Sequence, residues 1–114
     1  MAPPGTSPAF DLTSGPFTLA AGEGALLAEG PLTFASARHA RELGLEALAR
    51  GGSGPLIFDC KGVTASDSAG LTVLIDWLAA AKARQRSLRF THLPPGLMAL
   101  GRISEVEELL ERGV

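Results

Sequence analysis

One short segment, Thr64-Ala65-Ser66-Asp67-Ser68-Ala69-Gly70-Leu71, holds the residue types best suited to chemistry. Asp67 and Ser68 are favourable N-cap residues, because their side-chain oxygens accept hydrogen bonds from the unpaired N–H groups at the start of a helix. Ser68 is also a favourable phosphoacceptor, since the helix dipole and the free N–H groups stabilise an anion by about 0.3–1 kcal/mol at an exposed site. A phosphate adds about −1.5 to −2 charges and disrupts a docked partner without unfolding the domain. A capped helix without further function is the simpler alternative.

Gly70 falls in the first turn of this expected helix. Glycine costs about 0.5–1 kcal/mol relative to alanine inside a helix. The cost indicates either that another backbone approaches closely at Gly70 or that packing inside the fold requires a small residue there.

Enzymatic and metal-binding motifs are not recognised elsewhere in the sequence. Gly22-Glu23-Gly24 lacks the third glycine of a dinucleotide fingerprint, and Gly51-Gly52-Ser53-Gly54 lacks the Lys-Ser/Thr of a phosphate-binding loop. Ser68 does not lie in a G-x-S-x-G nucleophile elbow. The metal-ligand types are scattered without ligand spacing: His39, Cys60 and His92. We therefore expect no metal and no cofactor, and Cys60 as a small half-buried residue at a strand end.

Hydrophobic patterning predicts the elements that position this segment. We expect strands over 17–20, 25–29, 55–60 and 87–91, and helices over 34–49, 68–84, 94–103 and 104–111. Gly51-Gly52 is expected to end the first helix, and Ser104 to cap the last one with Glu107 at the capping-box position. The order β-β-α-β-α-β-α-α predicts a small α/β domain with a mixed sheet of about four strands.

The helix that begins at Ser68 carries the single tryptophan. Helical spacing places one apolar face toward the sheet: Leu71, Leu74, Ile75, Leu78 and Lys82. Trp77 then lies on roughly the opposite face, with Thr72 and Asp76 flanking it. Trp77 either forms part of a partner surface, where Trp is a favoured hot-spot residue, or is covered by the third helix.

Length and composition limit the class of protein. The chain has 114 residues, 46% hydrophobic and 19% charged, so we expect one folded domain rather than global disorder. A net charge of −2 gives no bulk attraction to nucleic acid or to an anionic membrane. Residues 1–16 hold four of the eight prolines and are expected to form a flexible N-terminal segment before a domain over 17–114.

The location expected from the sequence is the cytoplasm. A single cysteine excludes an internal disulfide and favours a reducing compartment. The N-terminus shows no secretory signal, and the longest apolar stretch, 69–81, is interrupted by Asp76 and is shorter than the about 20 residues of a membrane span. We therefore expect no direct membrane insertion.

The segment FDCKGVTASDSAGLTVLIDWLAAAKARQRSLRF, in this order of elements, resembles the STAS domains (sulfate transporter and anti-sigma factor antagonist). The resemblance covers nearly all of the chain after residue 16. Its pattern is an aspartate in the strand followed by D-[ST]-[SAG]-G-L at the helix start, carried here by Asp59, Val63, Asp67, Ser68, Ala69, Gly70 and Leu71. Cys60 and Lys61 depart from the more usual apolar-Ser pair.

Within this family the chain is most similar to the MlaB-like subunit of Mla-type phospholipid ABC transporters, through LTFASA, DSAGLTVLIDWLAAAKARQR and LPPGLMALGRISEVEELL. The resemblance implies a non-enzymatic subunit that binds the cytoplasmic ATPase, and through it the permease, at the inner membrane. It implies a contact at Ser68 with its motif neighbours. We expect the complete partner surface to comprise Thr64, Ser66, Asp67, Ser68, Ala69, Gly70, Thr72 and Trp77.

Other functions stay open at this point. In the anti-sigma factor antagonists the matching serine is phosphorylated, which would make Ser68 the phosphoacceptor. A small hydrolase that uses Ser68, Asp67 and a histidine is a third hypothesis. A mean hydropathy of +0.22 fits a protein that buries one face on a partner or, when alone, on a second copy of itself.

Overall fold

A computed structural model of the protein describes residues 16–50 and 54–114. Its elements are β1 (Thr18–Ala21), β2 (Leu26–Leu32), α2 (Ala37–Ala49), β3 (Leu56–Ser66), α3 (Ser68–Ala83), β4 (Leu88–Thr91), α4 (Pro95–Ile103) and α5 (Glu107–Arg112). The order β-β-α-β-α-β-α-α confirms the predicted fold class. The expected flexible segment, apart from Pro16, and the expected helix end at Gly51-Gly52 lie outside the described residues.

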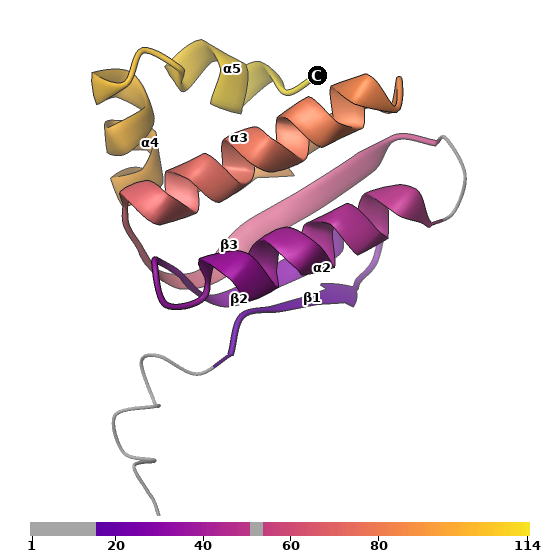
Figure 1. The fold of residues 1–114 in the computed structure, drawn as a ribbon, viewed down its shortest axis with the longest axis horizontal. Helices are drawn as coiled ribbons and strands as arrows, with labels where there is room; N and C mark the ends of the chain where they lie inside the picture. The colour runs from indigo at the N-terminus through magenta and orange to yellow at the C-terminus, as the bar shows by residue number, and fades with distance from the viewer. Residues whose placement is uncertain (1–15, 51–53) are drawn as a thin grey trace, which may run out of the picture.

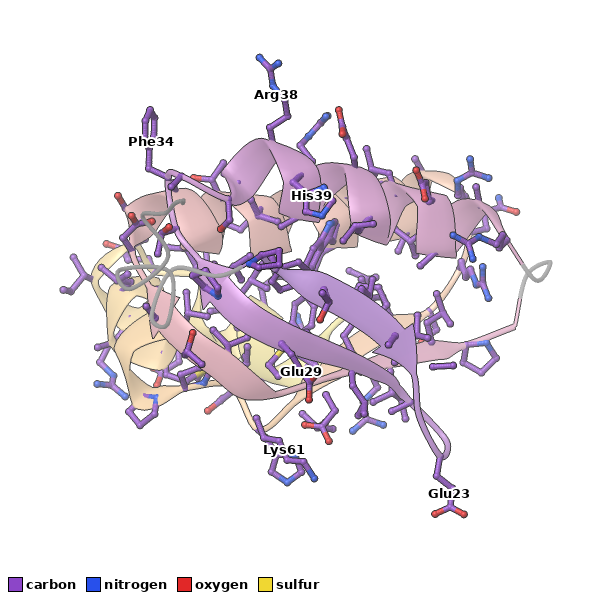
Figure 2. The ribbon with its side chains drawn as sticks, turned by 90° about the horizontal axis from the view of Figure 1, so that it is seen from below. Glu23, Glu29, Phe34, Arg38, His39 and Lys61 are labelled. Atoms are coloured by element: carbon purple, nitrogen blue, oxygen red, sulfur yellow. The ribbon has the colours of Figure 1, made fainter. Side chains whose placement is uncertain are left out.

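The four strands form one mixed sheet in the order β1-β2-β3-β4. β1 pairs antiparallel with β2, whereas β2 with β3 and β3 with β4 pair in parallel. Helices α2 and α3 cover one face of the sheet (Figure 1). Because side chains alternate along a strand, Phe58 and Cys60 are buried, while Lys61 is exposed. Figure 2 shows Glu29 and Lys61 pointing away from α2.

Trp77 lies fully buried in the core, which corrects both expectations for it. Its ring centroid lies 5.2 Å from that of Phe58, edge to face, and 6.0 Å from that of Phe17. Its indole N–H donates a hydrogen bond of 3.3 Å to the carbonyl of Arg41 in α2. The tryptophan is therefore covered by α2, and no third helix or external partner is needed to cover it.

The buried stripe of α3 is wider than the predicted face and rotated from it. Val73, Trp77 and Ala81 are buried together with Leu74 and Leu78, while Lys82 is exposed. The reason is that α3 contacts α2 and α4 as well as the sheet, so that more than one side of this helix is covered.

Gly44 allows the close approach of α2 to α3. It lies in the buried row Ala40, Gly44 and Leu48 of α2. A Cβ added at Gly44 would lie 2.0 Å from Trp77 Nε1, well inside van der Waals contact. The two helices therefore approach each other through a position without a side chain.

Strand β3 extends to Ser66, whereas the sequence predicted its end at Cys60 and a loop over 61–67. The extension follows from parallel pairing with β2, which continues through Pro31↔Ala65 and Leu32↔Ser66 despite irregularities in register. Cys60 is thus fully buried within the strand rather than half-buried at its end, and burial raises the pKa of its thiol to about 12.

The predicted cap of the last helix is also wrong. Ser104 is the C-cap of α4, and α5 begins only at Glu107. The chain reverses at Glu105, whose φ is +63°, and the Glu107 carboxylate accepts a hydrogen bond of 2.9 Å from Arg102 instead of folding back onto Ser104.

Arg86 holds the C-terminal end of α2. Its buried guanidinium donates hydrogen bonds to the carbonyls of Leu48 at 2.7 Å and Arg50 at 2.6 Å, and a further one to Gly54. The last carbonyls of a helix have no partner within it, so the Arg86 guanidinium takes the place of a capping group at this end. Among the helices of residues 16–50 and 54–114, none has the length and apolar character to cross a membrane.

Candidate functional site

Asp67 links the start of α3 to the loop after β2. Its Oδ1 accepts hydrogen bonds from the N–H groups of Ala69 at 2.9 Å and Gly70 at 3.1 Å, as predicted for an N-cap. Its Oδ2 accepts a bond of 3.0 Å from the Phe34 N–H, 33 residues away in sequence. These bonds, led by that from Phe34, lower the pKa of the Asp67 carboxyl below its usual value. One carboxylate therefore holds the start of α3 and the loop after β2 together.

Ser68 is exposed at the first position of α3, directly after the capping aspartate. Its backbone carbonyl accepts a hydrogen bond of 3.1 Å from Thr72 Oγ1, one turn further along the exposed side of the helix. The two hydroxyl residues thus form one accessible edge at the N-terminal end of α3.

Of the other predicted contact residues, some are accessible to a partner and some are covered by the fold. Thr64 is exposed near the end of β3, and Ala69 lines a groove beside α3. Ser66 is half-buried, and its Oγ would lie 3.5 Å from a Cβ added at Gly96, so it faces α4. Trp77 lies in the core and presents no side chain to a partner.

Gly70 is required by the internal packing of the domain. It is buried, and an added Cβ would lie 2.1 Å from the Leu32 carbonyl oxygen at the end of β2. The two explanations that the sequence left open coincide here, because the backbone that approaches Gly70 closely is that of Leu32 in the same domain. This glycine therefore does not by itself indicate a partner.

Phe34 is a surface residue, although the sequence predicts it only as the start of a helix. The residue is 84% exposed, although its backbone N–H is held by the Asp67 carboxylate. The neighbouring turn is ordered by Ser36, whose Oγ donates to the Pro31 carbonyl at 2.7 Å and accepts from the Thr33 N–H at 3.0 Å. The helix begins only at Ala37, which leaves the aromatic ring on the preceding loop.

A groove of about 310 Å³ runs between α2 and α3 next to this loop. Its lining has an apolar part, formed by Ala37, Ala69 and Val73, and a polar part, formed by Arg38, Arg41, Thr72 and Asp76. Arg41 pairs with Asp76 of α3 across the groove at 3.2 Å. The groove therefore combines apolar surface with guanidinium groups.

A second polar cluster surrounds Asp59 on β3. Its Oδ1 lies 3.0 Å from His92 Nδ1 and accepts a hydrogen bond of 3.0 Å from the Lys61 N–H. These contacts, the backbone bond from Lys61 foremost, lower the pKa of the Asp59 carboxyl. Within the described part of the chain, no three His, Cys, Asp or Glu side chains gather as a metal site would require.

Comparison with known proteins gives a matching family model and several solved structures of similar fold. A protein-family model described as "Mlab, STAS domain" matches residues 17–111. The anti-sigma factor antagonist SpoIIAA in its unphosphorylated form shares the fold with a TM-score of 0.56 at 14% identity, covering 82% of each chain. The inward-facing murine anion transporter Solute Carrier 26 family member A9 matches with a TM-score of 0.54 at 17% identity, over 78% of this chain and 14% of that one. The comparison with curated proteins gives no match.

Proposed function

The chain belongs to the family described as Mlab, STAS domain, and on this premise we propose that it is a non-enzymatic subunit of an Mla-type phospholipid ABC transporter. In this role it binds the cytoplasmic ATPase and supports assembly or activity of a transporter for outer-membrane lipid asymmetry. It would lie at the inner membrane through the ATPase and the permease, without inserting into the bilayer itself.

The observation that carries this proposal is the exposed Ser68 beside a rigidly held Asp67. A residue at the first position of α3 can contact a partner without any change in the fold, since the cap is made by its neighbour. Thr64, Ala69 and Thr72 extend the proposed contact around it. Asp67 and Gly70 contribute to the structure beneath this contact. Trp77 does not belong to the contact, because its side chain is buried.

The hydrolase hypothesis receives no support from the geometry. Both oxygens of Asp67 accept backbone hydrogen bonds, so this carboxylate is not free to orient a histidine. His92 pairs with Asp59 instead.

A pull-down from detergent-solubilised native membranes tests the proposal, with tagged wild type and a Ser68→Asp variant side by side. We expect an ABC ATPase and its permease with the wild type and their loss with the variant. Ser104→Asp is the matched control, because Ser104 is also exposed but lies at the end of α4. Unchanged capture by Ser68→Asp would remove Ser68 from the interface, and capture of no ABC ATPase would refute the transporter role.

The exposed Ser68 hydroxyl also favours a second function, that of an anti-sigma factor antagonist regulated by phosphorylation. A serine kinase of the anti-sigma type in the same pull-down, which phosphorylates the wild type but not Ser68→Ala, would decide for this function. The fold assignment would be unaffected by that result.

A further inference from the structure

Phe34 has the geometry of a preorganised binding anchor. The residue is 84% exposed, yet hydrogen bonds hold its loop on both flanks, since its own N–H donates to Asp67 while Ser36 bonds to Pro31 and Thr33. A large aromatic side chain on a rigid loop loses little conformational freedom when it binds, which is the condition for a hot spot. Exposure of this ring is therefore not explained by local disorder of the loop.

The groove between α2 and α3 supplies complementary surface next to this ring. Its lining of Ala37, Ala69 and Val73 consists of small apolar side chains that accept a bulkier apolar group. Figure 2 shows Phe34 and Arg38 projecting on the same side of the molecule, away from the sheet. They lie four residues apart in sequence, so one extended ligand can reach both.

The charge of the groove indicates which kind of polar group the ligand should carry. Arg41 is already paired with Asp76, whereas Arg38 forms no ion pair with any other residue of 16–50 and 54–114. The lining of the groove therefore carries one uncompensated positive charge, that of Arg38, although the whole protein has a net charge of −2. A carboxylate on the ligand would neutralise it.

We propose that Phe34 and the α2–α3 groove together bind a segment of the partner ATPase that combines bulky apolar side chains with at least one Asp or Glu facing Arg38. This inference rests on the proposed function and extends the interface from the N-terminal end of α3 onto α2. Phe34 is the apolar anchor, and Arg38 sets the charge and register of the bound segment.

Binding of the full-length protein to the ABC ATPase–permease complex captured in the pull-down tests this proposal. We expect Phe34→Ala and Arg38→Glu each to weaken the Kd by about tenfold or more. Phe34→Leu keeps an apolar anchor and is expected to weaken binding less than Phe34→Ala. Ile103→Ala is the matched control, because Ile103 is 79% exposed but lies at the end of α4, outside the groove lining.

Photo-crosslinking identifies the bound segment directly. With Phe34 replaced by p-benzoylphenylalanine, we expect a crosslink to an ATPase segment that contains apolar residues and an acidic one. Changing that acidic residue to lysine is expected to restore binding of Arg38→Glu.

Three results would overturn the inference: wild-type affinity of Phe34→Ala and Arg38→Glu for the captured ATPase, a crosslink to a second copy of this protein, or a crosslinked segment without a carboxylate. Each of them leaves the proposed function standing. Capture of no ABC ATPase by the wild type is the separate result that removes the proposed function and this inference with it.

Discussion

At the scale of single residues, Asp67 is the side chain on which the proposed site depends. It caps α3 through Ala69 and Gly70 and holds the loop of Phe34. We expect Asp67→Ala to lower the free energy of unfolding by about 0.5–2 kcal/mol, the usual cost of losing an N-cap, as measured by urea denaturation.

Asp76→Ala is the comparison for this prediction. Asp76 forms an exposed ion pair with Arg41, and such pairs contribute about 0–1 kcal/mol. An Asp67→Ala variant as stable as Asp76→Ala would contradict the capping role.

Gly70 and Gly96 both lie in the first turn of a helix but have different surroundings. A Cβ at Gly70 would lie 2.1 Å from the backbone oxygen of Leu32, whereas one at Gly96 would lie 3.5 Å from the nearest atom, Ser66 Oγ. We expect Gly70→Ala to destabilise the domain by about 1–3 kcal/mol through overpacking. Gly96→Ala should be neutral or stabilising by up to about 1 kcal/mol. Equal thermal unfolding midpoints for the two variants would refute this account.

The residues of the site were predictable from sequence where the cause is local. Capping by Asp67 follows from its position before an apolar helix, and the structure confirms it. Ser68, which the sequence favoured equally as a cap, is instead the exposed first residue of α3. The environments of Phe34 and Trp77 depend on which elements pack against them, and no spacing rule along one helix contains that information. A phenylalanine followed by small residues before a helix was the one available signal for Phe34.

At the scale of elements, the close contact between α2 and α3 at Gly44 can be tested directly by substitution. Gly44→Ala would place a methyl group 2.0 Å from Trp77 Nε1 and so force the helices apart. We expect a loss of about 1–3 kcal/mol in the free energy of unfolding and a change in tryptophan fluorescence, because Trp77 is the only emitter of its kind.

His39→Ala, on an exposed position of the same helix, is expected to change neither quantity. Acrylamide quenching of the wild type adds an independent check. Strong quenching of Trp77 in the native state would contradict its complete burial.

The order of the elements was predictable because the spacing of apolar residues within each segment distinguishes a helix from a strand. The end of β3 was not, since residues 61–66 are extended through pairing with β2 rather than through their own composition. The same holds for the start of α5, where the turn at Glu105 displaces the helix from the serine that the sequence favoured as its cap.

At the scale of the whole molecule, stability should depend on pH through two aspartates. The pKa values of Asp59 and Asp67 are both lowered in the folded state, mainly by backbone hydrogen bonds from Lys61 and Phe34. Their contribution is complete above the unfolded pKa of about 3.9 and is lost as the pH falls through the lower folded values. We expect the free energy of unfolding to fall between about pH 5 and 2.

A variant with both Asp59→Asn and Asp67→Asn separates this effect from general acid destabilisation. Its amides do not titrate, so we expect a smaller loss of stability over the same range of about pH 5 to 2, measured by urea denaturation at each pH. An equal loss in the variant and the wild type would show that other groups govern acid unfolding.

The burial of Cys60 makes the native protein a ready scaffold for site-specific labelling. The sequence has no other cysteine, and a thiol that is fully buried with a pKa of about 12 supplies almost no thiolate to a maleimide at neutral pH. A cysteine introduced at an exposed position such as Thr72 would therefore be the sole reactive group without any prior removal of the native one. A fluorophore or spin label placed there would report the arrival of a partner at the edge of α3, in a protein whose core sequence is unaltered.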